Sequence, residues 1–331
     1  MTARAFFYDA EGHDREIALA EVNVNSIGEQ ALLWIDIEGM ESGECESVAA
    51  LLRMRSQKPL ACQFDEGAAV IESFGDHISV GLALPHQSDL SSTGDAQLIQ
   101  PQREFLTFVI SDRWLVTSHA EAAPLLEQFR EKDKAETLIG ALSPASLAAA
   151  LMDWHLGLFF EGASGIADEV DALDERVLRD KANKSLLGRI VTLRRKTARL
   201  RSALVANRPV FYGLSRPDVA IVAPSDATGH FTVLAARFER ALDEIERVRD
   251  LLNGSFELFA SRSSLQTNTL VKALTIITAV FGYCGAVAGL FGMNVKSSLY
   301  NGGDGTFAII VGSLALTSIL AITLARTRRW I

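Results

Sequence analysis

Two long uncharged runs lie close together near the C-terminal end of this sequence. The first covers 273–295 and the second covers 306–325. A membrane-spanning helix needs about 20 predominantly apolar residues, and both runs reach that length. Two buried core helices are the alternative, but a core helix normally keeps a polar stripe that includes charges, and neither run carries one. The sequence therefore predicts two transmembrane helices.

Basic residues indicate how these helices cross the membrane. They precede the first run and form a basic tail over 326–331, whereas the connection over 296–305 holds only Lys296 and Asp304 as charged residues. Positive residues favour the cytoplasmic side. Both termini are therefore expected in the cytoplasm, and 296–305 is expected to be an external loop. No signal-peptide-like apolar segment opens the chain, which agrees with a cytosolic N-terminal part.

Strand and turn patterns dominate the region 1–142. The segments with strand patterns are 31–39 and two hairpins, 69–84 and 104–119, which turn near Gly75–Asp76 and 111–113. A helix is expected over 45–55, between the first strand and the hairpins. We interpret this region as a cytosolic α/β domain with a mixed sheet, within an α+β membrane protein.

The pattern becomes helical from Ser143, which precedes Pro144 as a helix cap precedes a first-turn proline. In the cytosolic helical region 143–229, one helix is expected to end near Lys181 and another to cover 184–206, with breakers over 207–218 and 223–229. No proline follows His230. A stalk helix over 230–272 is therefore expected to continue into the first transmembrane helix, over roughly 95 Å.

Polar and small residues recur along this long helix at spacings of three and four. In order they are Asp250, Gly254, Glu257, Ser261, Ser264, Asn268, Val271, Thr275, Thr278, Gly282, Gly285, Gly289 and Gly292. We name this set the polar seam. Its first part fits a solvated stripe, and its glycines, which include a GxxxG at 285–289, fit close helix packing. However, the seam continues into the first uncharged run, where no bulk water faces a helix.

We therefore favour a seam that lines a water-filled axis shared by several copies of the chain, because two helices cannot enclose a pore. The predicted lining residues are Glu257, Ser261, Ser264, Asn268, Val271, Thr275, Thr278, Gly282 and Gly285. Asn294 would then lie at the outer mouth. Magnesium gives up its water reluctantly, so a ring of neutral carboxamides could recruit the hydrated ion without trapping it. Asn294 could equally cap a helix that ends at Gly292.

The region 266–294 contains GMN at 292–294 and LVKALTIITAVF at 270–281, and the chain ends in RTRRWI. These stretches resemble the CorA-type metal-ion transporter family, which includes CorA magnesium channels and ZntB zinc transporters. The resemblance is specific over 266–294 and loose elsewhere, and WIDIEG, QKPLACQFDEGAAVI and DRWLVTSHAEAAPLLEQF are weaker matches. The resemblance implies a homopentamer in the bacterial inner membrane that transports divalent cations through a funnel of long helices. It places the selectivity ring on Gly292, Met293 and Asn294.

The resemblance also implies regulation and leaves the metal open. In CorA channels, cytosolic magnesium bound by acidic residues closes the pore; the candidates here are Asp168, Glu169, Asp171, Asp174 and Glu175. We favour a solvated helix face for this acidic run. The loop VKSSLYNGGDGT lacks the Met-Pro-Glu of many magnesium transporters and looks more like the ZntB branch. Magnesium is preferred; transport of zinc, cobalt or nickel, with or without protons, and a non-conducting metal sensor are the alternatives.

Other functional classes find little support in the sequence. The net charge of −9 argues against nucleic acid as a partner. Cys45, Cys62 and Cys284 form no CxxC pair and no zinc-site spacing with histidine. His86, His119 and His155 lie apart in the sequence, and no HExxH or phosphate-binding glycine loop occurs. We expect no enzyme and no cofactor; the partners would be further copies of the chain, lipid and a divalent cation that is transported or regulatory.

Overall fold

The structure is a computed structural model of the whole chain. It describes residues 2–9, 15–24, 27–28, 31–39, 42–55, 58–60, 69–86, 90, 104–120, 123–132, 142–180, 183–216, 225–293 and 303–327. These residues form two compact units. The first comprises Met1–Ala172 with Gly188–Gly254, and the second comprises Leu173–Leu187 with Ser255–Ile331.

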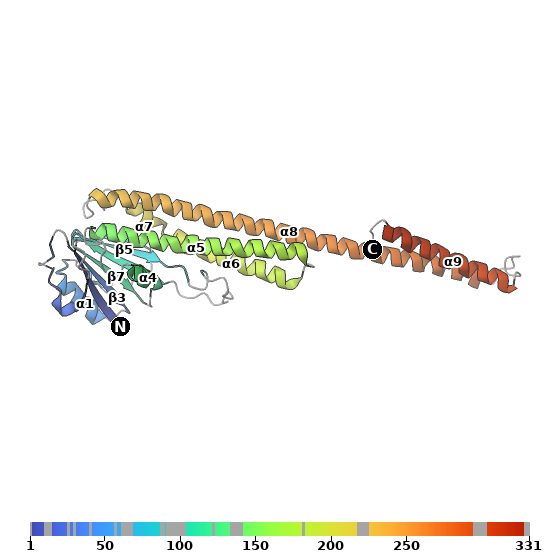
Figure 1. The fold of residues 1–331 in the computed structure, drawn as a ribbon, viewed down its shortest axis with the longest axis horizontal. Helices are drawn as coiled ribbons and strands as arrows, with labels where there is room; N and C mark the ends of the chain where they lie inside the picture. The colour runs from blue at the N-terminus through green and yellow to red at the C-terminus, as the bar shows by residue number, and fades with distance from the viewer. Residues whose placement is uncertain are drawn as a thin grey trace. The chain divides into compact units, whose positions relative to one another are not determined.

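The described strands of the first unit form one seven-stranded mixed sheet (Figure 1). They are β1 (Thr2–Asp9), β2 (Arg15–Ile17), β3 (Ala31–Glu38), β4 (Ile71–Ser73), β5 (His77–Ala83), β6 (Phe105–Ser111) and β7 (Trp114–His119), in the order β2-β1-β3-β7-β6-β5-β4. Among the described strands, only β3 and β7 pair in parallel. The predicted strand at 31–39 and both predicted hairpins are confirmed, and Gly75 adopts the positive φ of 88° that the first turn requires.

Alternating side chains give this sheet two apolar faces, as the period of a strand dictates. In β3, Leu32 and Trp34 point to one face, whereas Leu33 and Ile35 point to the other. The first face packs against long helices and α4 (Pro124–Lys132). The second face is covered by α1 (Ser42–Leu51). A soluble α/β domain with a mixed sheet is therefore confirmed.

Long helices follow the sheet. They are α5 (Pro144–Arg179), α6 (Lys184–Ala206), the short α7 (Arg208–Gly213) and α8 (Ser225–Gly292), which has 68 residues. The Oγ of Ser143 accepts a hydrogen bond from the N–H of Ser146 at 3.2 Å, which confirms the predicted cap of α5. The long uninterrupted helix that ends at Gly292 is also confirmed.

The structure corrects several details of the prediction. The predicted interruption over 207–218 is confirmed, since α6 ends at Ala206 and α8 begins only at Ser225, but the segment also contains the short helix α7, with Pro209 in its first turn, where a proline needs no N–H partner. The sequence predicts a breaker over 223–229, yet α8 already begins at Ser225. The helix expected over 45–55 begins at Ser42 and ends at Leu51; Arg53, just beyond it, has a positive φ of 53°.

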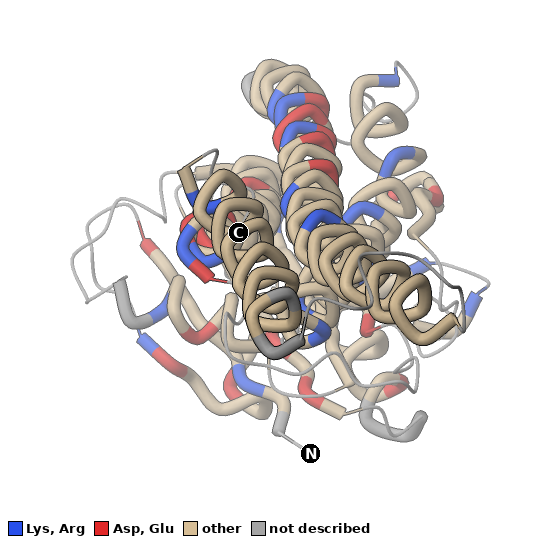
Figure 2. Tube along the Cα trace, turned by 90° about the vertical axis from the view of Figure 1, so that its right-hand side faces the viewer, with Lys and Arg blue, Asp and Glu red and all other residues tan. Residues whose placement is uncertain are grey.

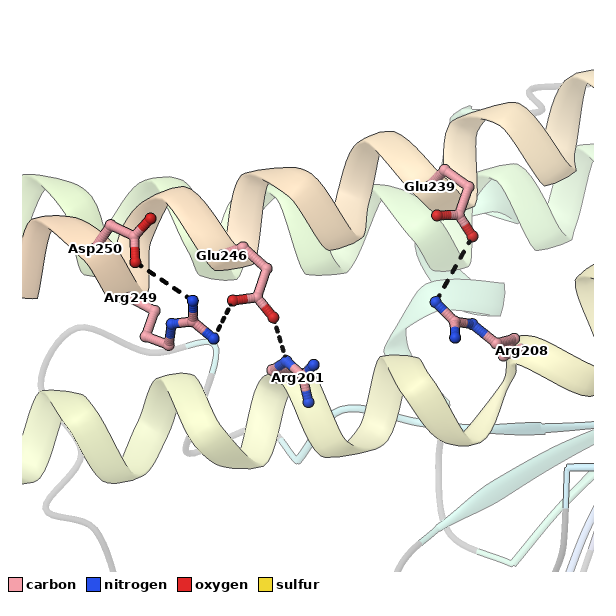
Figure 3. Close-up of polar contacts among 6 residues, drawn as sticks. All are labelled: Arg201, Arg208, Glu239, Glu246, Arg249 and Asp250. Atoms are coloured by element: carbon pink, nitrogen blue, oxygen red, sulfur yellow. Dashed lines mark hydrogen bonds and ion pairs between the residues drawn. The ribbon is translucent and has the colours of Figure 1, made fainter.

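Ion pairs connect α8 to its neighbours in the first unit (Figure 3). Arg201 of α6 donates its Nε–H to Glu246 of α8 at 2.5 Å, and this bond lowers the pKa of the Glu246 carboxyl below its usual value. Arg249 also pairs with Glu246 and with Asp250. Because these side chains are largely exposed, each pair contributes at most about 1 kcal/mol. Buried apolar contacts, such as the stacked rings of Phe211 and Phe238 at 5.0 Å, contribute more.

The second unit contains the C-terminal part of α8 and the helix α9 (Gly303–Thr327). Both helices are long and apolar enough to cross a membrane. Lys272 is the last charged residue of α8. Among the residues whose side chains the structure describes, the next charged one is Arg326 of α9 (Figure 2). Large apolar side chains such as Phe281 (74% exposed) and Ile309 (73%) lie open in the single chain. Such a surface requires lipid or further protein around it.

Candidate functional site

The polar seam lies on one exposed side of α8. Every seam member from Glu257 to Gly292 is exposed in the single chain. Within the apolar part of α8, from residue 273 to 292, a different set of residues is half-buried: Ala273, Ile276, Val280, Cys284 and Val287. At 3.6 residues per turn, these five residues lie roughly half a turn away from Thr275, Thr278, Gly282, Gly285 and Gly289. The seam and the half-buried side of α8 are therefore opposite each other.

The half-buried side of α8 packs against α9. The Sγ of Cys284 lies 3.8 Å from the Oγ of Ser318 on α9. On α9, Ile310, Leu314 and Ser318 are the half-buried residues and Ala325 is buried. Small polar groups at such a contact let two membrane helices approach closely. The contact with α9 thus leaves the seam available for something other than this chain.

Within the part of the chain that the structure describes, the seam glycines make no close packing contact. A Cβ added at Gly282, Gly285, Gly289 or Gly292 would meet no heavy atom there within 4 Å. A glycine that permitted close approach to α9 would show such contacts. At Gly213, for example, an added Cβ would lie 2.7 Å from the Cγ2 of Ile71. Two of the interpretations made from the sequence therefore remain for these glycines: packing between copies of the chain, and a wide lumen.

The predicted outer mouth lies at the end of α8. Gly292 is the last residue of the helix, and the N–H of Met293 donates to the carbonyl of Leu290 at 3.4 Å. Met293 is 56% exposed. Asn294 and Lys296 lie outside the described residues, so their predicted roles rest on the sequence.

The acidic residues of α5 do not form a metal site within one chain. Asp168, Asp171 and Glu175 are exposed, and Asp174 is half-buried. Glu169 pairs with Arg189 of α6, and Glu175 accepts a hydrogen bond from Arg179 at 2.6 Å. Across the described residues, no group of three or more His, Cys, Asp or Glu side chains could hold a metal ion. A site shared between copies stays a prediction.

Two histidines that lie apart in the sequence belong to buried polar clusters, a grouping that sequence reasoning missed. His119 of β7 lies 3.2 Å from Asp36 of β3, which also accepts a hydrogen bond from Thr117 at 2.5 Å. The parallel pairing of β3 and β7 brings these residues together, and no local spacing in the sequence indicates that pairing. The cavity beside them has a volume of about 10 Å³, which is room for about one water molecule.

The second cluster joins three elements of the first unit. Asn207 donates to the Nε2 of His155 at 3.1 Å and bonds both backbone groups of Ala83, at 2.7 and 3.0 Å. His155 is fully buried, and burial lowers the pKa of its imidazole to about 3. It is therefore neutral at physiological pH and accepts the Asn207 hydrogen bond, which is a structural role.

Comparison with known proteins decides the family. A family model described as "CorA-like Mg2+ transporter protein" matches residues 29–326. The chain belongs to this family. It is 22% identical over 240 residues to the cobalt/magnesium transport protein CorA of Thermotoga maritima, covering 72% of this chain and 68% of that protein. It is 33% identical over 132 residues to the divalent cation transporter CmaX of Pseudomonas aeruginosa, covering 40% of each.

The fold agrees with that membership. The structure of the CorA magnesium transporter from Methanocaldococcus jannaschii matches with a TM-score of 0.74 and 18% identity. The match covers 100% of this chain and 99% of that one. It shows the CorA-like fold: a soluble α/β domain, a long helix and two apolar C-terminal helices. The family resemblance stated from the sequence is thus confirmed.

Proposed function

We propose that this member of the CorA-like family conducts divalent metal cations, magnesium foremost, across the bacterial inner membrane through a pore formed by five copies of the chain. Both termini would lie in the cytoplasm. Hydrated ions would be selected at Gly292, Met293 and Asn294, and the seam would line the path from there to Glu257. The acidic residues of α5 would form a solvated helix face, and binding of cytosolic metal between subunits is the alternative for them.

One observation carries this proposal. The uncharged polar and glycine residues of α8 lie on the side opposite α9, where a Cβ added to the glycines would meet no heavy atom of the described residues within 4 Å. Polar groups that face lipid are costly. Copies of α8 arranged around an axis would remove Thr275 and Thr278 from lipid and give them water.

The preferred metal follows from the mouth and from the relatives. Gly-Met-Asn is intact at 292–294. The Thermotoga maritima relative is named for cobalt and magnesium transport, and the Pseudomonas aeruginosa relative for divalent cations. Zinc is the second candidate, because the loop after Asn294 is glycine-rich, as the sequence VKSSLYNGGDGT shows.

Flux of magnesium and zinc into liposomes, measured in parallel with and without a pH gradient, tests the proposal. We expect the wild type to carry magnesium, and Asn294→Ala to abolish that flux. Gln266→Ala is the matched control. It removes a carboxamide from α8 on the side away from the seam and should conduct as the wild type does.

The outcomes separate the candidate functions. Zinc flux that depends on the pH gradient, without magnesium flux, would replace magnesium transport with a proton-coupled zinc transporter. A wild type that binds metal but carries neither ion would be a sensor. Unchanged flux in Asn294→Ala would remove the selectivity role of the mouth while leaving transport in place.

A further inference from the structure

Basic residues gather at one end of the pair that the apolar part of α8 forms with α9. Lys272 directly precedes the apolar part of α8, and Arg326 lies in the last turn of α9. Two further arginines follow in the sequence, which from 258 onwards contains a single acidic residue, Asp304. Asp304 lies in the first turn of α9, about 33 Å along the helix from Arg326. The sequence at the other end is therefore basic, without any acidic residue.

Lys272 and Arg326 lie at nearly the same depth along the two antiparallel helices (Figure 1). The contact of Cys284 with Ser318, at 3.8 Å, aligns α8 with α9. Counted from this contact, Lys272 lies about 18 Å along α8 and Arg326 about 12 Å along α9, toward the same end. Their depths thus differ by about 6 Å, which is comparable with the thickness of one headgroup layer of a bilayer.

Both side chains border the apolar surface that requires lipid. Each is exposed, and no ion pair joins either of them to another described residue. Lys272 lies about a quarter turn from both the half-buried side of α8 and the seam. Exposed leucines lie two residues from each charge: Leu270 (71% exposed) and Leu274 (63%) on α8, and Leu324 (53%) on α9. Each charge therefore stands at the edge of a surface that acyl chains would cover.

We propose that Lys272 and Arg326 bind the phosphate groups of anionic phospholipids in the leaflet at this end of the helices. A long basic side chain keeps its alkyl stem on apolar surface and its charge in the headgroup layer. Basic groups close to a membrane are attracted to anionic lipids, whereas the ammonium of a zwitterionic headgroup offsets the charge of its phosphate. The inference requires that the helices cross a membrane and goes beyond the proposed function, because it does not depend on the conducted ion.

Two simpler roles of these charges make a different prediction about lipid. Positive residues beside a membrane helix set its orientation, and Arg326 complements the negative end of the α9 dipole. Both roles need only a charge at the end of a helix, so neither predicts a preference among lipids. A measured preference for anionic headgroups that depends on Lys272 and Arg326 therefore distinguishes a binding site from these roles.

Native mass spectrometry of the full-length chain in detergent tests the site, with phosphatidylglycerol and phosphatidylcholine of identical acyl chains as the probes. We expect the wild type to bind phosphatidylglycerol more tightly. Lys272→Gln and Arg326→Gln should each lower that affinity about fivefold, whereas Arg326→Lys keeps the charge and should bind nearly as the wild type does. The matched controls Lys184→Gln on α6 and Arg240→Gln in the N-terminal part of α8 remove other exposed charges and should change nothing.

The remaining results would overturn the proposal. They are equal binding of the two lipids by the wild type, unchanged affinity in both glutamine variants, and an equal loss in the controls, which would mean that net charge alone sets the preference. Displacement of the lipid by excess glycerol 3-phosphate would identify a free phosphate ester as the ligand instead. The wild type also carries a test that needs no variant to assemble: at 1 M salt, where screening acts within about 3 Å, the preference should disappear, and its persistence would contradict a charge-based site.

Discussion

At the scale of single residues, the buried polar groups of the soluble domain support the fold. His155 and Asn207 illustrate this role. Asn207 uses both ends of its carboxamide to satisfy Ala83, at the end of β5, and also donates to His155. Buried polar groups without such partners would cost about 1–3 kcal/mol each. The pair therefore fixes how the start of α7 meets the sheet.

The buried imidazole makes stability depend on pH. Its pKa is about 3 in the folded chain and about 6.5 when the chain is unfolded. As pH falls below 6.5, the unfolded chain binds a proton that the folded chain cannot accept, so the free energy of unfolding falls, and this continues until about pH 3. Between pH 7 and pH 5, we expect wild type to lose about 2 kcal/mol more than His155→Gln.

Urea unfolding of the detergent-solubilised protein, followed by tryptophan fluorescence, measures that difference. His155→Gln keeps a hydrogen-bonding side chain beside Asn207 and does not titrate. Equal pH profiles for the two proteins would show that His155 is protonated in the folded chain, contrary to its burial.

At the scale of elements, the contact of α9 with the side of α8 away from the seam can be tested by a cross-link. Cys284 lies 3.8 Å from Ser318, so Ser318→Cys places two thiols at this contact. On mild oxidation we expect a disulfide within one chain. After denaturation, a maleimide should label two fewer thiols per chain in the oxidised variant than in the same variant after reduction.

Leu316→Cys is the control for the cross-link. Leu316 is 69% exposed on the side of α9 away from α8, so its thiol should stay unpaired with Cys284. Efficient pairing of Leu316→Cys would place a different side of α9 against Cys284, and no pairing of Ser318→Cys would contradict the contact between Ser318 and Cys284.

Local patterns explain which elements the sequence predicted. The strand at 31–39 and both hairpins carry continuous apolar runs bounded by turn residues, and α6 follows helical periodicity to the residue, Lys184–Ala206. The strands β1 and β2 and the helix α4 were not predicted. The strand β2 has only three residues and forms by pairing with β1. A sequence pattern of three residues cannot reveal that pairing. The sequence predicts a breaker over 223–229, yet α8 begins at Ser225 and includes Gly229, because a glycine in a helix costs only about 1 kcal/mol.

The candidate site was predictable to a similar extent. Spacing along the chain placed Thr275, Thr278 and the glycines on one side of one helix, and the structure agrees. Which side of α8 meets α9 depends on tertiary packing of two apolar helices, and their composition is nearly uniform. The same limit hid the pairing of Asp36 with His119, because it arises from parallel strands far apart in the sequence.

At the scale of the whole molecule, the polar seam of α8 is exposed in the single chain. Among the described residues, a Cβ added at any seam glycine would meet no heavy atom within 4 Å, so we expect the role of these glycines to lie between copies of the chain. Either they let neighbouring copies of α8 pack closely, as a GxxxG does, or they widen a lumen on the shared axis. These two purposes predict different results for one substitution.

The substitution Gly285→Phe distinguishes packing between copies from a lumen on the shared axis. A Cβ at Gly285 has open space within the chain, so the single chain should fold unchanged. If the glycine faces a lumen, five phenyl rings would close it: the native mass by light scattering should match wild type, and magnesium flux should fall to roughly a tenth or less. If it serves packing between copies, the native mass should fall instead. Gly312→Phe on α9, also in open space, is the control that should change neither quantity.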